Sequence, residues 1–181
     1  MKTVSFSANS PFSPSRWGFL LLALGLLFAA PDSRAESEIS RKDRTFLLAA
    51  SQGALLEVRL GELATRNARR VEVKEFGERM VLDHSANLRE LQALAAQKGV
   101  TLPEDLDAKH QRHLDKMAAI PITEFDAAYI SAMIKGHQAV NRQFLAESGS
   151  TKDADIRGFV DKTIPVVTGH LARIQLLKKQ R

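Results

Sequence analysis

The sequence predicts an all-α protein, built as an antiparallel four-helix bundle. Apolar residues recur at intervals of three and four in four long stretches of the chain, which is the spacing of one face of an α-helix. The connections between these stretches are short, long and short. Helices joined by a short connection are antiparallel neighbours, so the pattern indicates two helix pairs joined by a long crossover between helices 2 and 3.

The first helix is expected from about Lys42 to Asn67, and the second from about Arg70 to Lys98. Ser40, with Asp43 three residues later, resembles a capping box at the start of the first helix. Gly99 is expected to end the second helix, since glycine is the residue most often found just beyond a helix C-terminus. The link between the two helices is tight, which makes them antiparallel.

The crossover spans residues 100–122 and is polar, with Pro103 and Pro121 at its two ends. It contains a short stretch from Asp107 to Ala118 that fits one further helix. A connection of this length is unusual in a compact domain and indicates a chain that returns along the whole bundle.

The third long helix is expected to open at Thr123, with Asp126 completing a second cap, and to end at Gly149. The fourth is expected from Asp153 to the C-terminus, with a kink at Pro165, because proline lacks the N–H that a helix interior requires. Four helices with one long crossover form the ferritin-like arrangement.

Residues 1–35 predict a secretory signal peptide. Lys2 and Arg16 precede an apolar run over residues 17–30, which is shorter than the roughly 20 residues that span a bilayer. Ser33 and Ala35 are small residues that suit cleavage after Ala35. We therefore expect a periplasmic or secreted domain of residues 36–181, with no stable membrane insertion of the mature chain.

Composition excludes several classes of protein. The chain has no cysteine, which excludes disulfide frameworks, thiol catalysis, iron–sulfur clusters, zinc fingers and covalent c-type haem. The formal charge of +5 falls to +3 when the three basic residues and one acidic residue of the expected signal peptide are removed. Nucleic-acid binding is not expected, because it needs a denser basic stripe or stacking aromatic residues.

Four polar residues lie on the apolar face of the expected helices, one from each helix: Glu57, His84, His137 and His170. Their distances from the expected helix starts are similar, so in an antiparallel bundle their side chains are expected to meet near mid-height. Asp83 points about 100° away from His84 around the helix. We expect Asp83 to orient a neighbouring ligand as a hydrogen-bond acceptor rather than to bind an ion itself.

One carboxylate and three imidazoles predict a mononuclear transition-metal site for Zn, Fe, Mn or Cu, since all four ions accept imidazole. Met80 and Met133 precede two of the histidines by one helical turn, but methionine at this spacing is more often core packing than a copper ligand. The alternative is a metal-free envelope or stress-related protein, in which a buried Glu–His hydrogen-bond cluster fixes the helix register. A third hypothesis is that facing histidines bind noncovalent haem.

The sequence does not assign a reaction. Ferritin-like di-iron enzymes place a glutamate three residues before a ligating histidine. Val81 and Val167 occupy those positions before His84 and His170. The bridging carboxylates of a di-iron centre are therefore missing, and no ferroxidase activity is expected.

Four segments resemble a bacterial ferritin-like domain family of unknown function, often labelled "predicted outer membrane protein". They include FGERMVLDHSANLREL at residues 76–91 and FDAAYISAMIKGHQAV at residues 125–140, with FLLAASQGALLEVRLGELA at 46–64 and an Ile-Pro…His pattern ending at His170. The resemblance covers residues 41–177. It implies an exported four-helix bundle with Glu57, Asp83 and the three histidines as its motif positions, and it implies no established activity or partner.

Overall fold

The computed structural model describes residue 3 and residues 39–180, and this part of the chain is all-helical, without strands. Apart from residue 3, the predicted signal peptide lies outside the described residues. Five helices follow one another along the chain: α1 (Arg41–Asn67), α2 (Val71–Gln97), α3 (Ala108–Ala118), α4 (Ile122–Ser148) and α5 (Ala154–Lys179).

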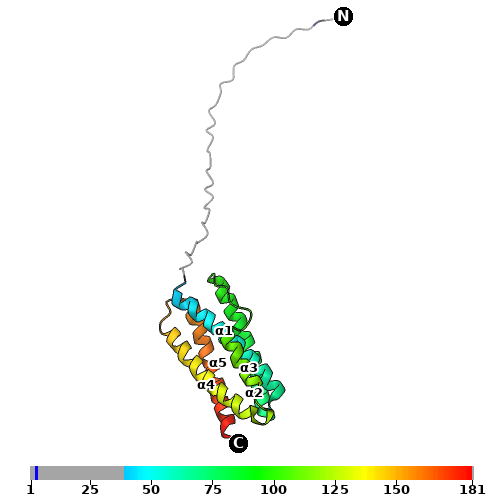
Figure 1. Cartoon of the computed structure of the whole chain (residues 1–181). Coiled ribbons are helices and arrows are strands. Elements are labelled where there is room, and N and C mark those ends of the chain that lie inside the picture. The colour runs from blue at the N-terminus through cyan, green and yellow to red at the C-terminus, as the bar shows by residue number, and fades with distance from the viewer. Residues whose placement is uncertain (1–2, 4–38, 181) are drawn as a thin grey trace. The chain divides into compact units, whose positions relative to one another are not determined.

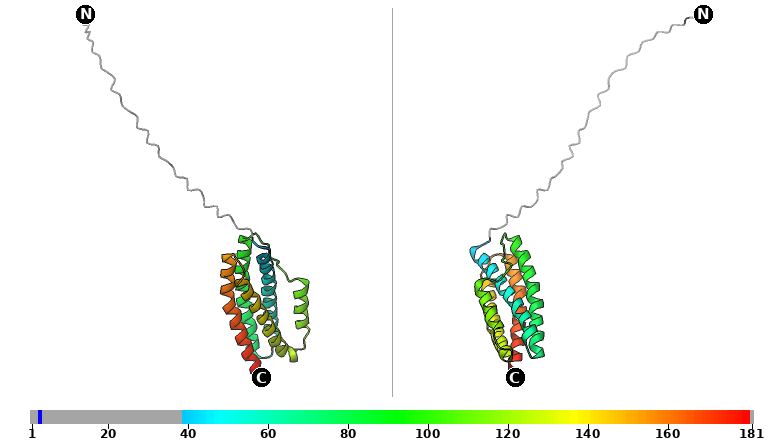
Figure 2. Two further views of the ribbon diagram at one scale, coloured as in Figure 1. Left: turned by 90° about the vertical axis from the view of Figure 1, so that its left-hand side faces the viewer. Right: turned by 45° about the vertical axis from the view of Figure 1, so that its right-hand side comes forward.

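The four long helices run side by side, and each is antiparallel to the helices it packs against (Figure 1). The most extensive packing is between α1 and α2 and between α4 and α5, and smaller contacts join α1 to α4 and α2 to α5. The short helix α3 lies on the crossover from α2 to α4 and packs against α1 and α4, beside the long helices (Figure 2). Among the described helices, none combines the length and the apolar character that crossing a membrane requires.

The ends of the first two helices follow the sequence prediction. Ser40 caps α1, since its hydroxyl oxygen accepts a hydrogen bond from the Asp43 backbone N–H at 3.0 Å. At the end of α2, Gly99 has a φ of 63°, in the left-handed region that glycine adopts without strain. The Val100 N–H then bonds back to the Ala95 carbonyl at 2.8 Å, which satisfies a carbonyl at the helix end.

The predicted cap of the third long helix is wrong. Helix α4 begins at Ile122 after Pro121, and no side chain caps it. Asp126 instead accepts hydrogen bonds from the backbone N–H groups of Arg69 and Arg70, at 3.0 and 2.9 Å. The Asp126 carboxylate therefore satisfies backbone N–H groups just before α2 that have no partner within the helix. Local sequence does not reveal this tertiary contact.

Helix α5 begins after Asp153, whose carboxylate accepts hydrogen bonds from the N–H groups of Asp155 and Ile156. Pro165 lies inside α5, and the helix continues past it to Lys179. The missing N–H of Pro165 costs one hydrogen bond without ending the helix; a kink there stays a prediction.

The apolar core is divided into two clusters along the helices. One cluster packs Phe76, Tyr129, Met80 and Met133 with residues of α1 and α5 near the end where α1 stops. The other gathers Phe46, Phe144 and Phe159 with apolar residues of α2 near the end where α1 starts. Both methionines are fully buried core residues, and the predicted polar residues occupy the level between the two clusters.

Two glycines bring α1 and α2 close together. A Cβ atom at Gly61 would lie 2.7 Å from the Gly77 carbonyl oxygen, and one at Gly77 would lie 2.8 Å from the Gly61 carbonyl oxygen. Such contacts are sterically forbidden, so this crossing requires glycine in both helices. The close approach of the two backbones at Gly61 and Gly77 is consistent with the extensive packing of α1 on α2.

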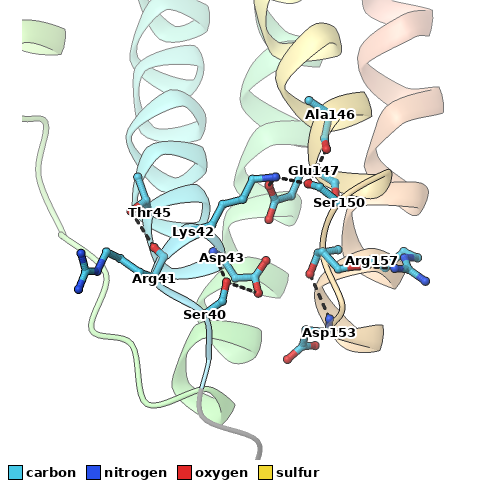
Figure 3. A network of polar contacts seen from close by, with 11 residues as sticks. Ser40, Arg41, Lys42, Asp43, Thr45, Ala146, Glu147, Ser150, Asp153 and Arg157 are labelled. Atoms are coloured by element: carbon cyan, nitrogen blue, oxygen red, sulfur yellow. Dashed lines mark hydrogen bonds and ion pairs between the residues drawn. The ribbon is translucent and has the colours of Figure 1, made fainter.

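A polar network covers the end of the molecule where α1 starts (Figure 3). Lys42 of α1 reaches Glu147 near the end of α4, with Nζ 3.5 Å from Oε2, and also donates to Ser150. Beside it, Lys98 lies 2.7 Å from Asp153 and 2.7 Å from Asp155 at the start of α5. The network thus joins all four long helices at this end.

Candidate metal centre

His84, His137 and His170 meet in the middle of the molecule, each from a different helix. Their ring centroids are 5.9 Å apart for His84 and His137, 5.4 Å for His84 and His170, and 5.5 Å for His137 and His170. One ring nitrogen from each histidine lies within 4.8 Å of those of the other two. All three residues are buried, so no bulk water separates them.

The backbone of α4 fixes the proton position of His137. Its Nδ1 lies 2.9 Å from the Met133 carbonyl oxygen, one turn earlier in the same helix. A carbonyl only accepts hydrogen bonds, so Nδ1 must carry the proton. The lone pair is therefore on Nε2, which is buried and has no hydrogen-bond partner in the protein.

Asp83 fixes the proton of His170 in the same way. The Nε2 of His170 lies 2.8 Å from Asp83 Oδ2, and the same carboxylate oxygen binds Arg79. Partial burial raises the pKa of Asp83, but the hydrogen bonds from His170 and Arg79 outweigh this, and the net pKa is lowered. Asp83 is therefore ionised and accepts, which leaves the lone pair of His170 on Nδ1, also buried and without a partner.

Burial keeps the three imidazoles neutral. It lowers the pKa of His84 to about 3 and that of His137 to about 4, with the neighbouring histidines adding to the effect. Burial also lowers the pKa of His170, although Asp83 opposes the shift. Neutral imidazole is the form that binds metal ions. The Nε2 of His84 is likewise buried without a partner, so all three rings meet the requirements of ligands.

Glu57 lies beside the cluster rather than within the group of three. Its Oε1 is 4.0 Å from Nδ1 of His137, the nitrogen that already donates to Met133. Gly136 makes room for it, because a Cβ at that position would lie 3.2 Å from Oε1. Burial raises the pKa of Glu57 to about 8, so its carboxyl is mostly protonated at neutral pH. The assignment of Glu57 as a ligand stays a prediction.

Aromatic side chains close one side of the cluster. The ring of Phe76 lies 6.4 Å from that of His137 and 6.3 Å from that of His170, centroid to centroid. Tyr129 follows behind Phe76, 6.4 Å from it, and its buried hydroxyl has no partner. Burial raises the pKa of Tyr129, and Glu57 adds to this effect once its carboxyl ionises. These rings lie on the side of the cluster that faces the apolar residues near the end where α1 stops.

Three cavities border the cluster, and the largest of them, of about 460 Å³, is lined by Phe76, Asp83 and His170. A groove of about 170 Å³ between α2 and α5 is lined by His84 and His170, and also by Asn87 and Thr163. A smaller cavity of about 40 Å³ shares His84, Asn87 and Thr163 with the groove and extends to Glu57. That smaller volume is on the scale of one or two water molecules. The Asn87 side-chain amide donates to the Thr163 hydroxyl at 2.9 Å, between the groove and the smaller cavity.

The helical periodicity of the sequence identifies the residues that converge but not several others that shape the site. The structure brings His84, His137 and His170 together, places Asp83 on His170, and places Glu57 next to His137. Asn87, Thr163 and the Met133 carbonyl were not anticipated. Thr163 occupies the inward face of α5 two turns before His170, and a polar residue on an apolar stripe was the available signal.

Comparison with known proteins gives a family and two similar structures. The model of a domain of unknown function, DUF4142, matches residues 28–177. The crystal structure of a DUF305 fragment from Deinococcus radiodurans has a TM-score of 0.69 at 12% identity, covering 78% of this chain and 98% of that one. CopM in the Cu(I)-bound form has a TM-score of 0.65 at 17% identity, covering 76% of this chain and 96% of that one. At these identities the likeness shows the fold alone. No curated protein sequence matches.

Proposed function

The chain belongs to the DUF4142 family, and we propose that it binds a single transition-metal ion through His84, His137 and His170. One observation carries the proposal: each of the three buried rings has a nitrogen without a hydrogen-bond partner. Buried polar atoms in native proteins nearly always have partners, and an orphaned atom calls for an explanation such as a bound ion. Three of them on rings packed against one another fit a first coordination sphere.

Hydrogen bonds to the other ring nitrogens support this proposal. A metal-binding histidine typically donates its second N–H to a carboxylate or a backbone carbonyl, which fixes the tautomer and the ring orientation. His170 does so to Asp83, and His137 does so to the Met133 carbonyl. By contrast, a metal-free Glu–His cluster would be held by hydrogen bonds among its own members, and the unpartnered ring nitrogens and Glu57 Oε2 argue against that reading.

The charge of the site favours a low-charge ion, and we place copper first among Zn, Fe, Mn and Cu. Three neutral imidazoles and a mostly protonated Glu57 add no negative charge, and the ionised Asp83 is shared with Arg79. An uncompensated charge in a buried site is costly, so a monovalent ion is accommodated more easily than a divalent one. The Cu(I)-bound state of CopM, a protein of the same fold, is consistent with this choice.

We also propose the finer architecture and the location. The four long helices form an antiparallel bundle of the ferritin-like kind, with α3 on the crossover, and residues 1–35 direct export to the periplasm or beyond. The helix order and antiparallel packing support the first statement. Cell fractionation with mass analysis of the mature N-terminus tests the second, and a chain that keeps residues 1–35 in the cytoplasm would refute it.

Metal analysis of tag-free protein tests the main proposal. The purified protein is loaded separately with Cu(I), Zn, Mn or Fe(II), passed through a desalting column and analysed for metal per chain and for melting temperature. We expect one ion per chain for copper, and a melting temperature that rises with the ion and falls with a chelator, because a ligand that binds only the folded state stabilises it. Metal-free protein with an unchanged melting temperature would favour the metal-free envelope protein.

A further inference from the structure

The groove between α2 and α5 leads from the surface to two of the three histidines. His84 and His170 line it, whereas His137 does not. The exposed fractions agree with this arrangement, at 9% for His84, 6% for His170 and 1% for His137. The contacts between α2 and α5 are also far fewer than those between α1 and α2, where the paired glycines bring the backbones together.

Most of the residues that line the groove are polar or charged, which suits small polar ligands. Asn87 and Thr163 offer an amide and a hydroxyl at its inner end, and Arg79, Asp83, Glu90 and Lys162 surround it with both signs of charge. Lys162 pairs with Glu90 at 2.8 Å, and Arg79 pairs with Asp83. The mixed, paired charges give no strong preference for anions or cations. A volume of about 170 Å³ is below the range that holds drug-sized ligands.

We propose that metal ions and small exogenous ligands of a few non-hydrogen atoms reach the histidine cluster through this groove, passing Val166 to contact His84 and His170. Val166 is 43% exposed and lines the groove and also a second hollow that adjoins it at Asp83 and His170. A larger side chain at position 166 would therefore narrow the groove near the surface, and a smaller one would widen it. This inference deepens the proposed function and rests on it, but its first test needs no metal.

The first test measures the accessibility of each histidine in metal-free protein. Diethyl pyrocarbonate modifies neutral imidazole, and peptide mass spectrometry reports the rate for each residue. We expect His84 and His170 to react faster than His137. Val166→Trp should slow the first two by about tenfold, since obstruction of the approach lowers an association rate, and Val166→Ala should raise both rates. Leu176→Trp is the matched control, because Leu176 is 51% exposed on the same helix and lies outside the groove residues.

The second test measures metal association by stopped flow on the same four proteins. We expect Val166→Trp to slow Cu(I) uptake while the final stoichiometry stays at that of the unchanged protein, because the ligands are untouched. Equal histidine rates in Val166→Trp, Leu176→Trp and the unchanged protein would overturn the inference, as would His137 reacting as fast as His84. If the histidine rates follow the prediction but no ion is retained, the proposed function fails and the groove stands as a route for small molecules.

Discussion

The two buried polar regions of the molecule differ in how their polar atoms are satisfied. At the end where α1 starts, each charged group has a partner: Lys98 contacts Asp153, Lys42 contacts Glu147, and Asp43 accepts from Ser40. In the middle, His137 and His170 each have a partner on one ring nitrogen, and each of the three rings has a buried nitrogen without a partner. The charges of the end network are paired within the protein, although Asp43 Oδ1 and Glu147 Oε1 are buried without a hydrogen-bond partner, whereas the centre leaves one nitrogen of every histidine ring without a partner.

This difference separates stability from binding. Pairing and capping at the helix ends lower the free energy of the folded state directly. Burying neutral histidines without partners has a free-energy cost, because each ring loses its hydrogen bonds to water. Changes in the centre are therefore expected to alter metal content, and changes at the end where α1 starts are expected to alter the stability of the metal-free protein.

The largest effect is expected from His84→Ala, which removes one of three ligands. Metal content after desalting should fall from one ion per chain to near zero, while the metal-free protein keeps its helical circular dichroism. His113→Ala is the control, because His113 is exposed on α3 and should leave metal content unchanged. Retention of a full ion by His84→Ala would show that the binding site lies elsewhere.

A smaller loss is expected from Asp83→Asn. The amide cannot accept the His170 proton with the strength of a carboxylate, so the ring is less well oriented and less basic. Loss of such a supporting hydrogen bond weakens metal affinity by about 10- to 100-fold. Competition with a chelator of known affinity measures the change. Asp153→Ala, which alters a carboxylate of the end network, should leave the affinity as it is.

Asp153→Ala should instead reduce stability. It removes the cap of α5 and the partner of Lys98, and loss of a helix cap costs about 1 to 2 kcal/mol. Urea unfolding of the metal-free protein measures the loss. An unchanged midpoint, or a loss of bound metal at constant stability, would contradict the division between the two regions.

An effect that vanishes near pH 4.5 and grows with pH is expected from Glu57→Gln. The folded-state pKa of Glu57 is raised to about 8 from 4.5. As pH rises from 4.5 to 8, the unfolded chain releases the proton first, so this group lowers stability across that window. Glutamine does not ionise. The metal-free variant should match the unchanged protein near pH 4.5 and melt about 3 °C or more above it at pH 8.5. Equal melting temperatures at both pH values would show that Glu57 is not held protonated.

The helices and the histidine set could be predicted from sequence because both depend on the helical period. Ser40, Gly99 and Asp153 also act locally, through caps that a few neighbouring residues define. Asp126 could not be predicted, since it binds the backbone of a segment distant in sequence. For the same reason, periodicity indicated that Glu57 faces inward but not that its carboxyl lies beside the protonated side of His137. Side-chain direction within a shared layer depends on tertiary packing.

The three-histidine site depends on the tautomer of each ring, which long-range proton–nitrogen NMR spectra of the protein labelled with nitrogen-15 at histidine report. We expect metal-free His137 to carry its proton on Nδ1 and metal-free His170 to carry its proton on Nε2. Added Cu(I) should then shift the opposite nitrogen of each ring, together with Nε2 of His84. Reversed tautomers, or shifts confined to the two histidines of α3, His110 and His113, would contradict a metal centre formed by the three buried rings.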